Sequence, residues 1–382
     1  MKLYRNRATY LFFEEGKTIK EIVNQVVNEF NLKEHLPTIE RNIYNWTKDR
    51  GLYEACKGAG IDYDNVSHYW HKGKHFSINV KKNESFDIDI EGIISNCMKD
   101  YEPVKKNNHV STYEMFDRLI WTDVHVGMDA SRNGLALYPV EWNADMLFNR
   151  INEMALFVIR NKTSDTLIID ELGDFMDGWD AETTRKGHKL PQNMTNEEAF
   201  DTGIKAKILL VELLSKEYKF IYCNNICEDN HAGSFGYVVN SAFKQIVDHK
   251  FNNVEITNHQ KFINHYIIGK HAFIITHGKD SRNLKFGFKP ILDPRTTEKI
   301  SQYIRHNPDL RFVENIEFSK GDSHQCLFDM CTSDEFDYFN YPAFSPSSEW
   351  VQTNFKKGRS GFVMQNISKN TSQKITKTYF FN

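Results

Sequence analysis

Small groups of aspartate, histidine and asparagine follow five short apolar runs in the last two thirds of the 382-residue chain. The groups are Asp123-Val-His125, Gly173-Asp174-Phe-Met-Asp177, Asp229-Asn230-His231, His277-Gly278 and Gly321-Asp322-Ser-His324. Oxygen and imidazole ligands together suit divalent manganese, iron or zinc better than calcium. One such group alone is more often a capping pair or a turn. Five of them in order predict a cluster of divalent metal ions.

The apolar runs have the character of β-strands, and helix-like stretches such as 149–158 and 197–214 lie between them. The runs are at 119–121, 166–169, 220–222, 273–276 and 316–318. This alternation predicts an α/β domain, which we place at residues 113–382. Sites in open α/β sheets form beyond the carboxyl ends of the strands, so the strand ends would bring the five groups together.

The order of these groups, DxH, GDxxD, NH, HG and GxxH over residues 116–330, resembles the calcineurin-like metallophosphoesterase superfamily. The opening TDVHVG is similar to the form seen in double-strand-break repair exonucleases and related bacterial phosphoesterases. The later SKGDSHQ, followed by FNYPAFSPSSEWVQTNFKKGRSGF, resembles phage and prophage proteins of the same superfamily. The resemblance implies a four-layer α/β/β/α sandwich of two sheets flanked by helices, in a phage- or prophage-encoded protein.

The resemblance also implies a ligand set for two divalent metal ions. The first ion would be held by Asp123, His125 and His324, the second by Asn230, His277 and Asp322, and the bridge would be Asp174. A carboxylate suits the bridge because it has two oxygens to share. We expect manganese first, with iron, zinc or magnesium as the alternatives.

The chain departs from the family pattern at three places. Asp322 stands where the final Gly-His-x-His motif has its first histidine, and this harder oxygen ligand shifts the preference toward manganese or magnesium. A carboxylate, that of Asp229, precedes the Asn-His pair instead of following it. Gly178 follows Asp177 where protein serine/threonine phosphatases carry a phosphate-clamping arginine, which counts against a protein phosphatase.

The implied reaction is in-line attack on phosphorus by a hydroxide that bridges the two metal ions. By the same resemblance, His231 would contact the phosphoryl group or protonate the leaving oxygen, and Asp177 would orient its imidazole. A purely structural His231 is the alternative. Basic side chains near the motifs are candidates for substrate binding, or else an ordinary solvated surface: Arg185, His188, Lys279 and Arg282.

The first 58 residues have the pattern of a small all-helical domain. Thr18 and Glu21 have the spacing of a capping box, and a third helix starts at Pro37 and ends at Gly51. Polar and basic side chains on the third helix predict a DNA-binding helix-turn-helix, and the alternative is a helical bundle that docks on the catalytic domain. These side chains are Arg41, Asn42, Asn45, Lys48 and Arg50. Residues 59–112 are expected to form a short β extension and a linker.

Composition and charge narrow the classes of function. A net charge of −3, with 40% hydrophobic and 26% charged residues, is typical of a soluble globular protein whose DNA contacts come from a local basic surface. No apolar stretch approaches the roughly 20 residues that span a bilayer, and the first residues lack the pattern of a signal peptide. We therefore expect a cytoplasmic protein without a membrane partner. The six cysteines lack the spacing of a structural zinc site.

Two functions of different kinds remain open. The first is a phosphodiesterase or nuclease that the N-terminal helices bring to DNA. The alternative is a phosphodiesterase or phosphatase for a small nucleotide or nucleotide signal, with the N-terminal helices used for assembly. A regulatory protein with a degenerate site ranks last, because every ligand position still holds a residue that can bind metal.

Overall fold

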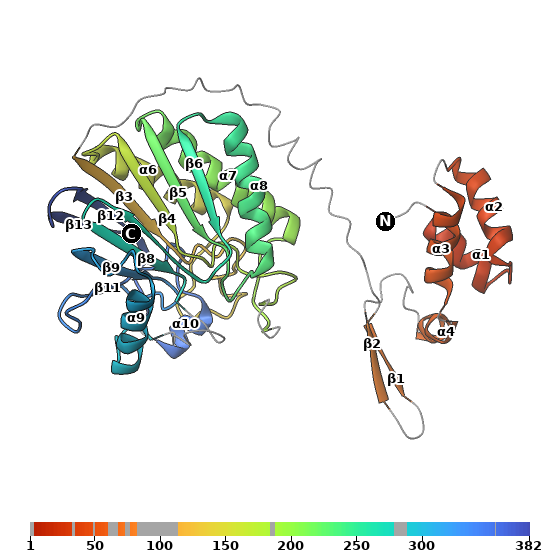
Figure 1. The fold of residues 1–382 in the computed structure, drawn as a ribbon. Helices are drawn as coiled ribbons and strands as arrows, with labels where there is room; N and C mark the ends of the chain where they lie inside the picture. Colours follow the sequence, from red (N-terminus) through yellow and green to blue (C-terminus); the bar gives the residue numbers. More distant parts are fainter. Residues whose placement is uncertain are drawn as a thin grey trace. The chain divides into compact units, whose positions relative to one another are not determined.

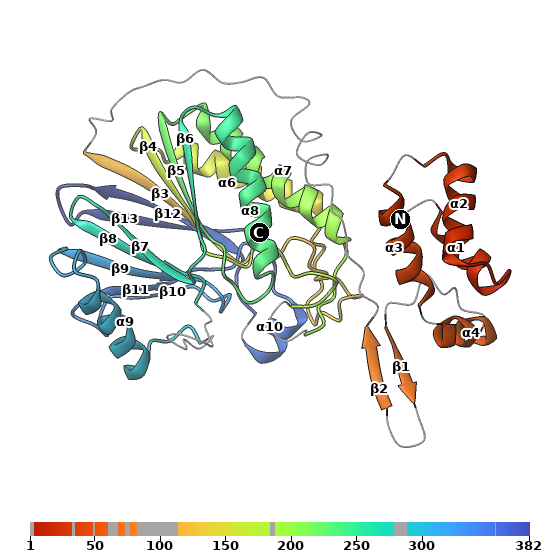
Figure 2. The same cartoon turned by 45° about the vertical axis from the view of Figure 1, so that its right-hand side comes forward.

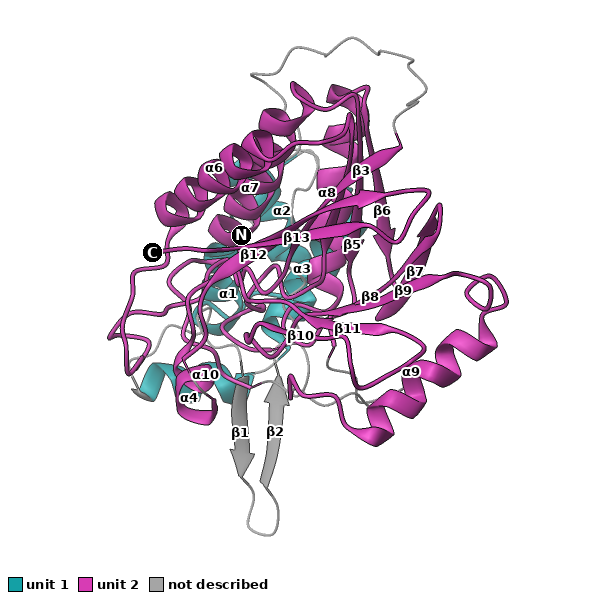
Figure 3. Ribbon diagram, turned by 90° about the vertical axis from the view of Figure 1, so that its left-hand side faces the viewer, with its two compact units in different colours: residues 1–88 teal, residues 89–382 magenta. Residues whose placement is uncertain are grey.

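The computed structural model describes residues 4–32, 35–48, 50–59, 68–72, 77–81, 114–183, 188–278, 289–355 and 357–382. The chain forms two compact units, Met1–Ile88 and Asp89–Asn382 (Figure 3). The boundary between the units falls inside the segment 59–112, where we expected a linker. The helices and strands of both units are labelled in Figures 1 and 2.

Three helices of the first unit, α1 (Arg5–Phe13), α2 (Ile19–Phe30) and α3 (Leu36–Thr47), pack around one apolar cluster. The buried residues of the cluster recur at helical spacing, so each helix turns one apolar face inward. The predicted capping box of the second helix is confirmed. The hydroxyl of Thr18 accepts from the backbone N–H of Glu21, whose side chain accepts from the Thr18 N–H in return.

The predicted end of the third helix at Gly51 is wrong. The helix α3 ends at Thr47, and Gly51 lies in a fourth helix, α4 (Arg50–Ala59). Leu52 and Cys56, one helical turn apart, form a small apolar cluster with the end of α1. This burial outweighs the helix-breaking tendency of a glycine, so Arg50 belongs to the start of α4 and not to the third helix.

An antiparallel hairpin of β1 (His68–Lys72) and β2 (Ser77–Lys81) follows these helices in the sequence. The hairpin falls within residues 59–112, where a short β extension was expected. Apart from Ala59, the other residues of that segment lie outside the described ranges. The described secondary structure of the first unit is therefore four helices followed by one hairpin.

The strands of the second unit form two β-sheets. In chain order they are β3 (Met115–Trp121), β4 (Thr166–Glu171), β5 (Phe220–Ile226), β6 (Val254–His259), β7 (Ile263–Ile268), β8 (His271–Thr276), β9 (Asn315–Lys320), β10 (Leu327–Asp329), β11 (Asp337–Asn340), β12 (Gly361–Ser368) and β13 (Lys374–Phe380). The six-stranded sheet has the order β13-β12-β3-β4-β5-β6, with β3 to β6 parallel. The five-stranded sheet has the order β10-β11-β9-β8-β7, with β11, β9 and β8 parallel. Each of the five predicted apolar runs lies in one of these strands.

Helices cover the outer faces of both sheets (Figures 1 and 2). The six-stranded sheet packs against α6 (Ala144–Arg160), α7 (Asn196–Ser215) and α8 (Ser234–Lys250), and the five-stranded sheet against α9 (Pro294–His306). A further apolar cluster, with residues from β3, β4, β8 and β11, fills the space between the sheets. A short helix, α10 (Glu349–Asn354), lies between β11 and β12 in the chain. The predicted mixed α/β fold preceded by helices is confirmed.

One buried guanidinium joins the two sheets. Arg118 of β3 is fully buried, and its Nε is 2.6 Å from the Oδ2 of Asp170 on β4. Its Nη1 is 2.5 Å from the Oε1 of Glu317 on β9 in the other sheet. Gln365 of β12 and Ser319 of β9 accept further hydrogen bonds from the same guanidinium. The guanidinium thus pairs with a buried carboxylate of each sheet, and Lys374 of β13 gives Glu317 a second cation at 2.9 Å.

Replacing Arg118 with alanine should destabilise the second unit strongly. Asp170 would be left buried without its cation and Glu317 would keep only Lys374, and breaking a buried ion pair in this way costs about 3–5 kcal/mol. Denaturant unfolding followed by tryptophan fluorescence measures the change. Lys205→Ala is the control, because its ion pair with Asp201 is exposed and should contribute less than about 0.5 kcal/mol. Equal effects of the two substitutions would show that Arg118 does not hold the sheets together.

Candidate metal centre

The seven predicted metal ligands gather at one end of the two sheets. Each follows the carboxyl end of a strand, which is β3, β4 or β5 in the six-stranded sheet and β8 or β9 in the five-stranded sheet. All seven are buried, with exposures of at most 9%. They are Asp123, His125, Asp174, Asn230, His277, Asp322 and His324. Polar side chains of this kind are costly to bury together unless they bind a cation or one another.

Five of these ligand residues have a left-handed backbone, which residues other than glycine rarely adopt. Their φ angles are 53° at Asp123, 48° at His125, 49° at Asp174, 68° at Asp322 and 53° at His324. Each such residue costs on the order of 1 kcal/mol. Backbone hydrogen bonds hold the first two loops in this shape, because Asp123 N–H donates to the Gly173 carbonyl and His125 N–H to the Asp174 carbonyl. Strain concentrated on ligand residues is typical of a functional site.

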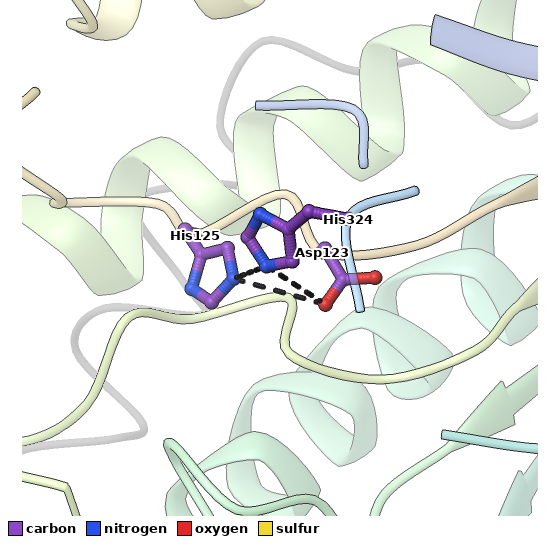
Figure 4. A group of neighbouring side chains, drawn as sticks. All are labelled: Asp123, His125 and His324. Atoms are coloured by element: carbon purple, nitrogen blue, oxygen red, sulfur yellow. Dashed lines mark hydrogen bonds and ion pairs between the residues drawn. The ribbon is translucent and has the colours of Figure 1, made fainter. Parts of the chain in front are cut away.

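The first group of candidate ligands is Asp123, His125 and His324 (Figure 4). The two imidazole Nε2 atoms lie 3.2 Å apart, and Nε2 of His324 is 3.3 Å from Oδ1 of Asp123. That Oδ1 is buried and accepts no hydrogen bond from any described residue. Two ring nitrogens and a carboxylate oxygen that converge in this way fit a divalent cation placed between them.

The second group surrounds the ring of His277. Its Nε2 is 3.0 Å from Oδ2 of Asp174, 3.1 Å from Oδ1 of Asn230 and 3.7 Å from Oδ1 of Asp322. Ligand atoms of Asp123, Asp174 and His277 all lie within 4.8 Å of one another. Asp123 is therefore common to both groups, while Asp174, the predicted bridge, lies in the second. The buried aspartate and histidine side chains can hold a metal ion.

Hydrogen bonds at the outer ring nitrogens fix how two of the histidines face the site. Nδ1 of His277 is 3.0 Å from the backbone carbonyl oxygen of Leu172, and Nδ1 of His125 is 3.0 Å from Oδ1 of Asp177. Both partners are acceptors, so Nδ1 carries the proton whenever either ring is neutral, as it must be to bind a metal ion. The lone pair of Nε2 then points toward the other ligands, which is the usual arrangement of a metal-binding histidine.

The charges of the site suit metal binding. Burial raises the pKa of Asp123, but His324 and His277 outweigh it and bring this pKa down to about 2. Burial also raises the pKa of Asp174, yet His231 and His277 lower it well below its usual value. Both aspartates are therefore ionised near neutral pH, as metal-binding carboxylates must be.

His231 lies beside the ligands and is 20% exposed. Its Nδ1 is 3.0 Å from the backbone carbonyl oxygen of Asp177 and 3.4 Å from Oδ1 of the same residue. Burial opposes protonation of His231, but Asp174 and Asp177 raise its pKa to about 10. The carboxylate of Asp177 lies closer to His125 than to His231, so the predicted link between Asp177 and His231 is made largely by the main chain.

Asp229 contributes to the site in a way that the sequence analysis missed. Its Oδ2 accepts from the backbone N–H of Asp174, and its Oδ1 accepts from the N–H groups of His231, Ala232 and Gly233. The side chain thereby ties the loop after β4 to the loop after β5. Burial, reinforced by the nearby Asp174 carboxylate, raises the pKa of Asp229 to about 7. Its position directly before the Asn-His pair was the only sequence signal.

A second support, also missed, lies behind Asp174. The Oε1 of Glu171 accepts from the backbone N–H of Gly173 at 2.7 Å, and its Oε2 is 2.9 Å from Nζ of the buried Lys207. Gly173 has a φ of 98°, and a Cβ at this position would lie 3.0 Å from the Cβ of His277. The buried Lys207–Glu171 pair therefore fixes a turn that only glycine fits, directly before a ligand.

A pocket of about 440 Å³ opens over these side chains. His188, one of the predicted substrate-binding residues, lines it together with His231 and several ligands. The other three predicted residues, Arg185, Lys279 and Arg282, lie outside the described residues. The structure thus places one of the four basic candidates at the site.

The predicted DNA-binding residues belong to the first unit. Arg41, Asn45 and Lys48 are exposed on α3 or directly after it, and Asn42 is partly buried. Arg50, at the start of α4, forms an exposed ion pair with Glu54. Four of the five predicted side chains therefore stay together along α3.

The comparisons with known proteins give no relative. No protein-family model matches the chain, and no curated protein matches it. In the described part of the chain, no helix is both long and apolar enough to cross a membrane. The converging aspartate and histidine side chains are thus the main indication of function.

Asp229→Asn should weaken metal binding without unfolding the protein. The substitution keeps the shape of the side chain but replaces one of the two acceptor oxygens that hold four backbone N–H groups by an amide donor, and such supporting residues typically contribute 10- to 100-fold in metal affinity. Calorimetric titration with manganese measures the dissociation constant. Asp248→Asn, the same change at a half-exposed position on α8, is the control. Unchanged affinity in Asp229→Asn would mean that the two loops do not need this tie.

Proposed function

We propose that this protein is a binuclear metal-dependent phosphoesterase that acts as a phosphodiesterase or nuclease on DNA. The observation that carries the proposal is the convergence of seven buried ligand side chains from five strand ends in two sheets. Hydrolysis of phosphate esters is a common use of paired divalent cations, because two cations can stabilise both the attacking and the leaving oxygen.

The fold supports the same class of enzyme. Helices, a six-stranded sheet, a five-stranded sheet and a further helix follow one another as layers (Figure 2). This order agrees with the four-layer α/β/β/α sandwich implied by the resemblance to calcineurin-like metallophosphoesterases. The resemblance itself rests on the order of the ligand motifs along the chain, which does not depend on the layers.

The donor set favours manganese. The first group has two imidazoles and one carboxylate, and the second combines one imidazole with carboxylate and amide oxygens. Mixed nitrogen and oxygen ligands suit manganese, with iron, zinc or magnesium as the alternatives, and Asp322 adds an oxygen ligand. When bound, two such cations supply an attacking water of lowered pKa and neutralise charge on the phosphate oxygens.

His231 is the group best placed to handle a proton in this reaction. It lines the pocket, and Nδ1 of its ring is 3.0 Å from the backbone carbonyl oxygen of Asp177. The backbone carbonyl of Asp177 fixes Nδ1 as a donor, and Nε2 lies on the side of the candidate ligands, 3.7 Å from Oδ2 of Asp174. We infer that Nε2–H donates to a phosphoryl oxygen or passes its proton to the leaving oxygen.

DNA as the partner is supported by the exposed face of α3. Arg41 and Lys48 form no ion pair with any described residue, whereas other cations of the first unit, such as Arg7 and Lys57, are paired with glutamates. Asn45 lies on the same exposed face of the helix. Cations that are not neutralised, next to a polar side chain, suit the phosphate backbone and the base edges of DNA.

The alternative substrate, a small nucleotide or nucleotide signal, is favoured by the size of the pocket. About 440 Å³ lies within the range of small-molecule sites. In that case the helices of the first unit serve assembly, and duplex DNA is neither bound nor cut. The two predictions that follow test the chemistry and the partner separately.

Asp174→Ala and His231→Ala should separate metal binding from proton transfer. Asp174→Ala should lose both bound metal and activity, because its carboxylate faces His277 within the second group. His231→Ala should keep its metal and lose on the order of a hundredfold or more in turnover. Elemental analysis and hydrolysis of a chromogenic phosphodiester with manganese measure the two effects. Parent protein that neither binds metal nor hydrolyses any phosphoester would refute the proposed class.

The double variant Arg41→Ala, Lys48→Ala should bind duplex DNA more weakly and with a smaller dependence on salt. Two lost phosphate contacts make the slope of log affinity against log salt shallower by about 1.8. Fluorescence anisotropy of the full chain, with a chelator to prevent cleavage, measures the slope. Lys17→Ala with Lys57→Ala is the matched control, because both lysines are paired with glutamates. Equal slopes in both double variants would favour the small-nucleotide alternative.

A further inference from the structure

Besides the candidate ligands, two segments line the pocket. The first wall is the loop after His125 together with residues 188–191, which are joined by the hydrogen bond from Asp129 N–H to the Pro191 carbonyl. The second wall is residues 348–351, at the start of α10. A phosphate bound at the ligands would therefore share the pocket with side chains of both walls.

Trp350 gives the second wall a broad aromatic surface. Its side chain lines the pocket and is 46% exposed, although indole rings are usually well buried. The ring of Phe355 packs against it at a centroid distance of 5.4 Å and an angle of 62°. Trp350 therefore combines a half-exposed indole ring in the pocket lining with a ring contact to Phe355 of the same segment.

The segment that carries Trp350 is fixed to the rest of the second unit. The hydroxyl of Ser348 caps the first turn of α10 by accepting from the N–H of Val351. The side chain of Gln352 accepts from the N–H of Tyr138 and donates to the carbonyls of Tyr138 and Ser347. The aromatic wall is thereby held in place relative to the loop that follows the first ligands.

The first wall has the chemistry of a phosphate contact. His188 and Lys189 are exposed side chains that line the pocket, next to the apolar Leu190 and Pro191. A ligand that satisfies both walls has an anionic group near these side chains and a flat aromatic ring against Trp350. A nucleotide unit within a polynucleotide combines the two.

We propose that this pocket binds single-stranded nucleic acid, with one unpaired base stacked on Trp350. In a duplex the bases are stacked on one another and paired, so a base reaches a protein ring only where the strand is single or the base is flipped out. The proposal rests on the proposed function and defines its substrate class. Trp350 acts as a specificity-determining residue, and the reacting phosphodiester is one adjacent to the stacked base.

Two trinucleotides with the same phosphates test the proposal in the full, manganese-loaded chain. One is trithymidylate, and the other carries the same sugars and phosphates without bases. Trp350→Ala should lower kcat/KM for trithymidylate by roughly 5- to 100-fold, mainly through KM, because one stacked base contributes that much. The abasic compound should be cleaved equally by the parent and by Trp350→Ala. Trp350→Phe should retain most of the preference for bases.

Phe312→Ala is the matched control, since Phe312 is 91% exposed and does not line the pocket. It should leave both trinucleotides unaffected, and the parent should cut a single strand faster than the same sequence in a blunt duplex. Equal losses on both trinucleotides in Trp350→Ala, or duplex cut as readily as single strand, would overturn the proposal. Calorimetry in the presence of a chelator measures binding of both trinucleotides without hydrolysis. This separates the proposed base stacking from the proposed phosphoesterase activity. Trp350-dependent base binding without any hydrolysis would support stacking and refute the phosphoesterase, whereas hydrolysis without Trp350 dependence would refute stacking alone.

Discussion

The site depends on the two sheets keeping their positions across a shared interface, because its ligands come from both. Asp123 and His324 lie 3.3 Å apart at the closest ligand atoms but follow strands of different sheets. Apolar packing alone would allow the sheets to slide over each other, since the hydrophobic effect has no direction. The guanidinium of Arg118 adds direction, because its fixed fork pairs with Asp170 in one sheet and Glu317 in the other.

Buried polar side chains also hold the individual ligand loops in shape. Asp229 gathers backbone N–H groups from two loops, and Glu171 with Lys207 shapes the turn before Asp174. Buried charges in the second unit are thus arranged in a chain from the sheet interface to the ligands. Such networks are costly unless every member finds a partner, and the ligand oxygen of Asp123 is an exception that a cation would satisfy.

The strands that lead into the site could be predicted from the sequence, because each of their apolar runs is followed by residues that can bind a metal ion. It did not reveal β12, which is wholly buried yet contains polar residues such as Gln365 and Asn366. Gln365 bonds to Arg118 and Asn366 to Asp117, so these contacts are visible only once distant strands are side by side. Asp229 and Lys207 were missed for the same reason. The end of the third helix was misplaced because tertiary packing of Leu52 and Cys56 overrides the local preference of Gly51.

The left-handed backbone at the ligands limits how this site can change in evolution. Aspartate, asparagine and histidine tolerate that conformation better than most residues, and all three are also metal ligands. Exchanges among them, such as aspartate for histidine at a position like 322, alter the ligand atom without reshaping the loop. Most other replacements would remove the ligand atom and would also strain the left-handed main chain. The backbone of these loops is therefore compatible with several donor atoms at the same place.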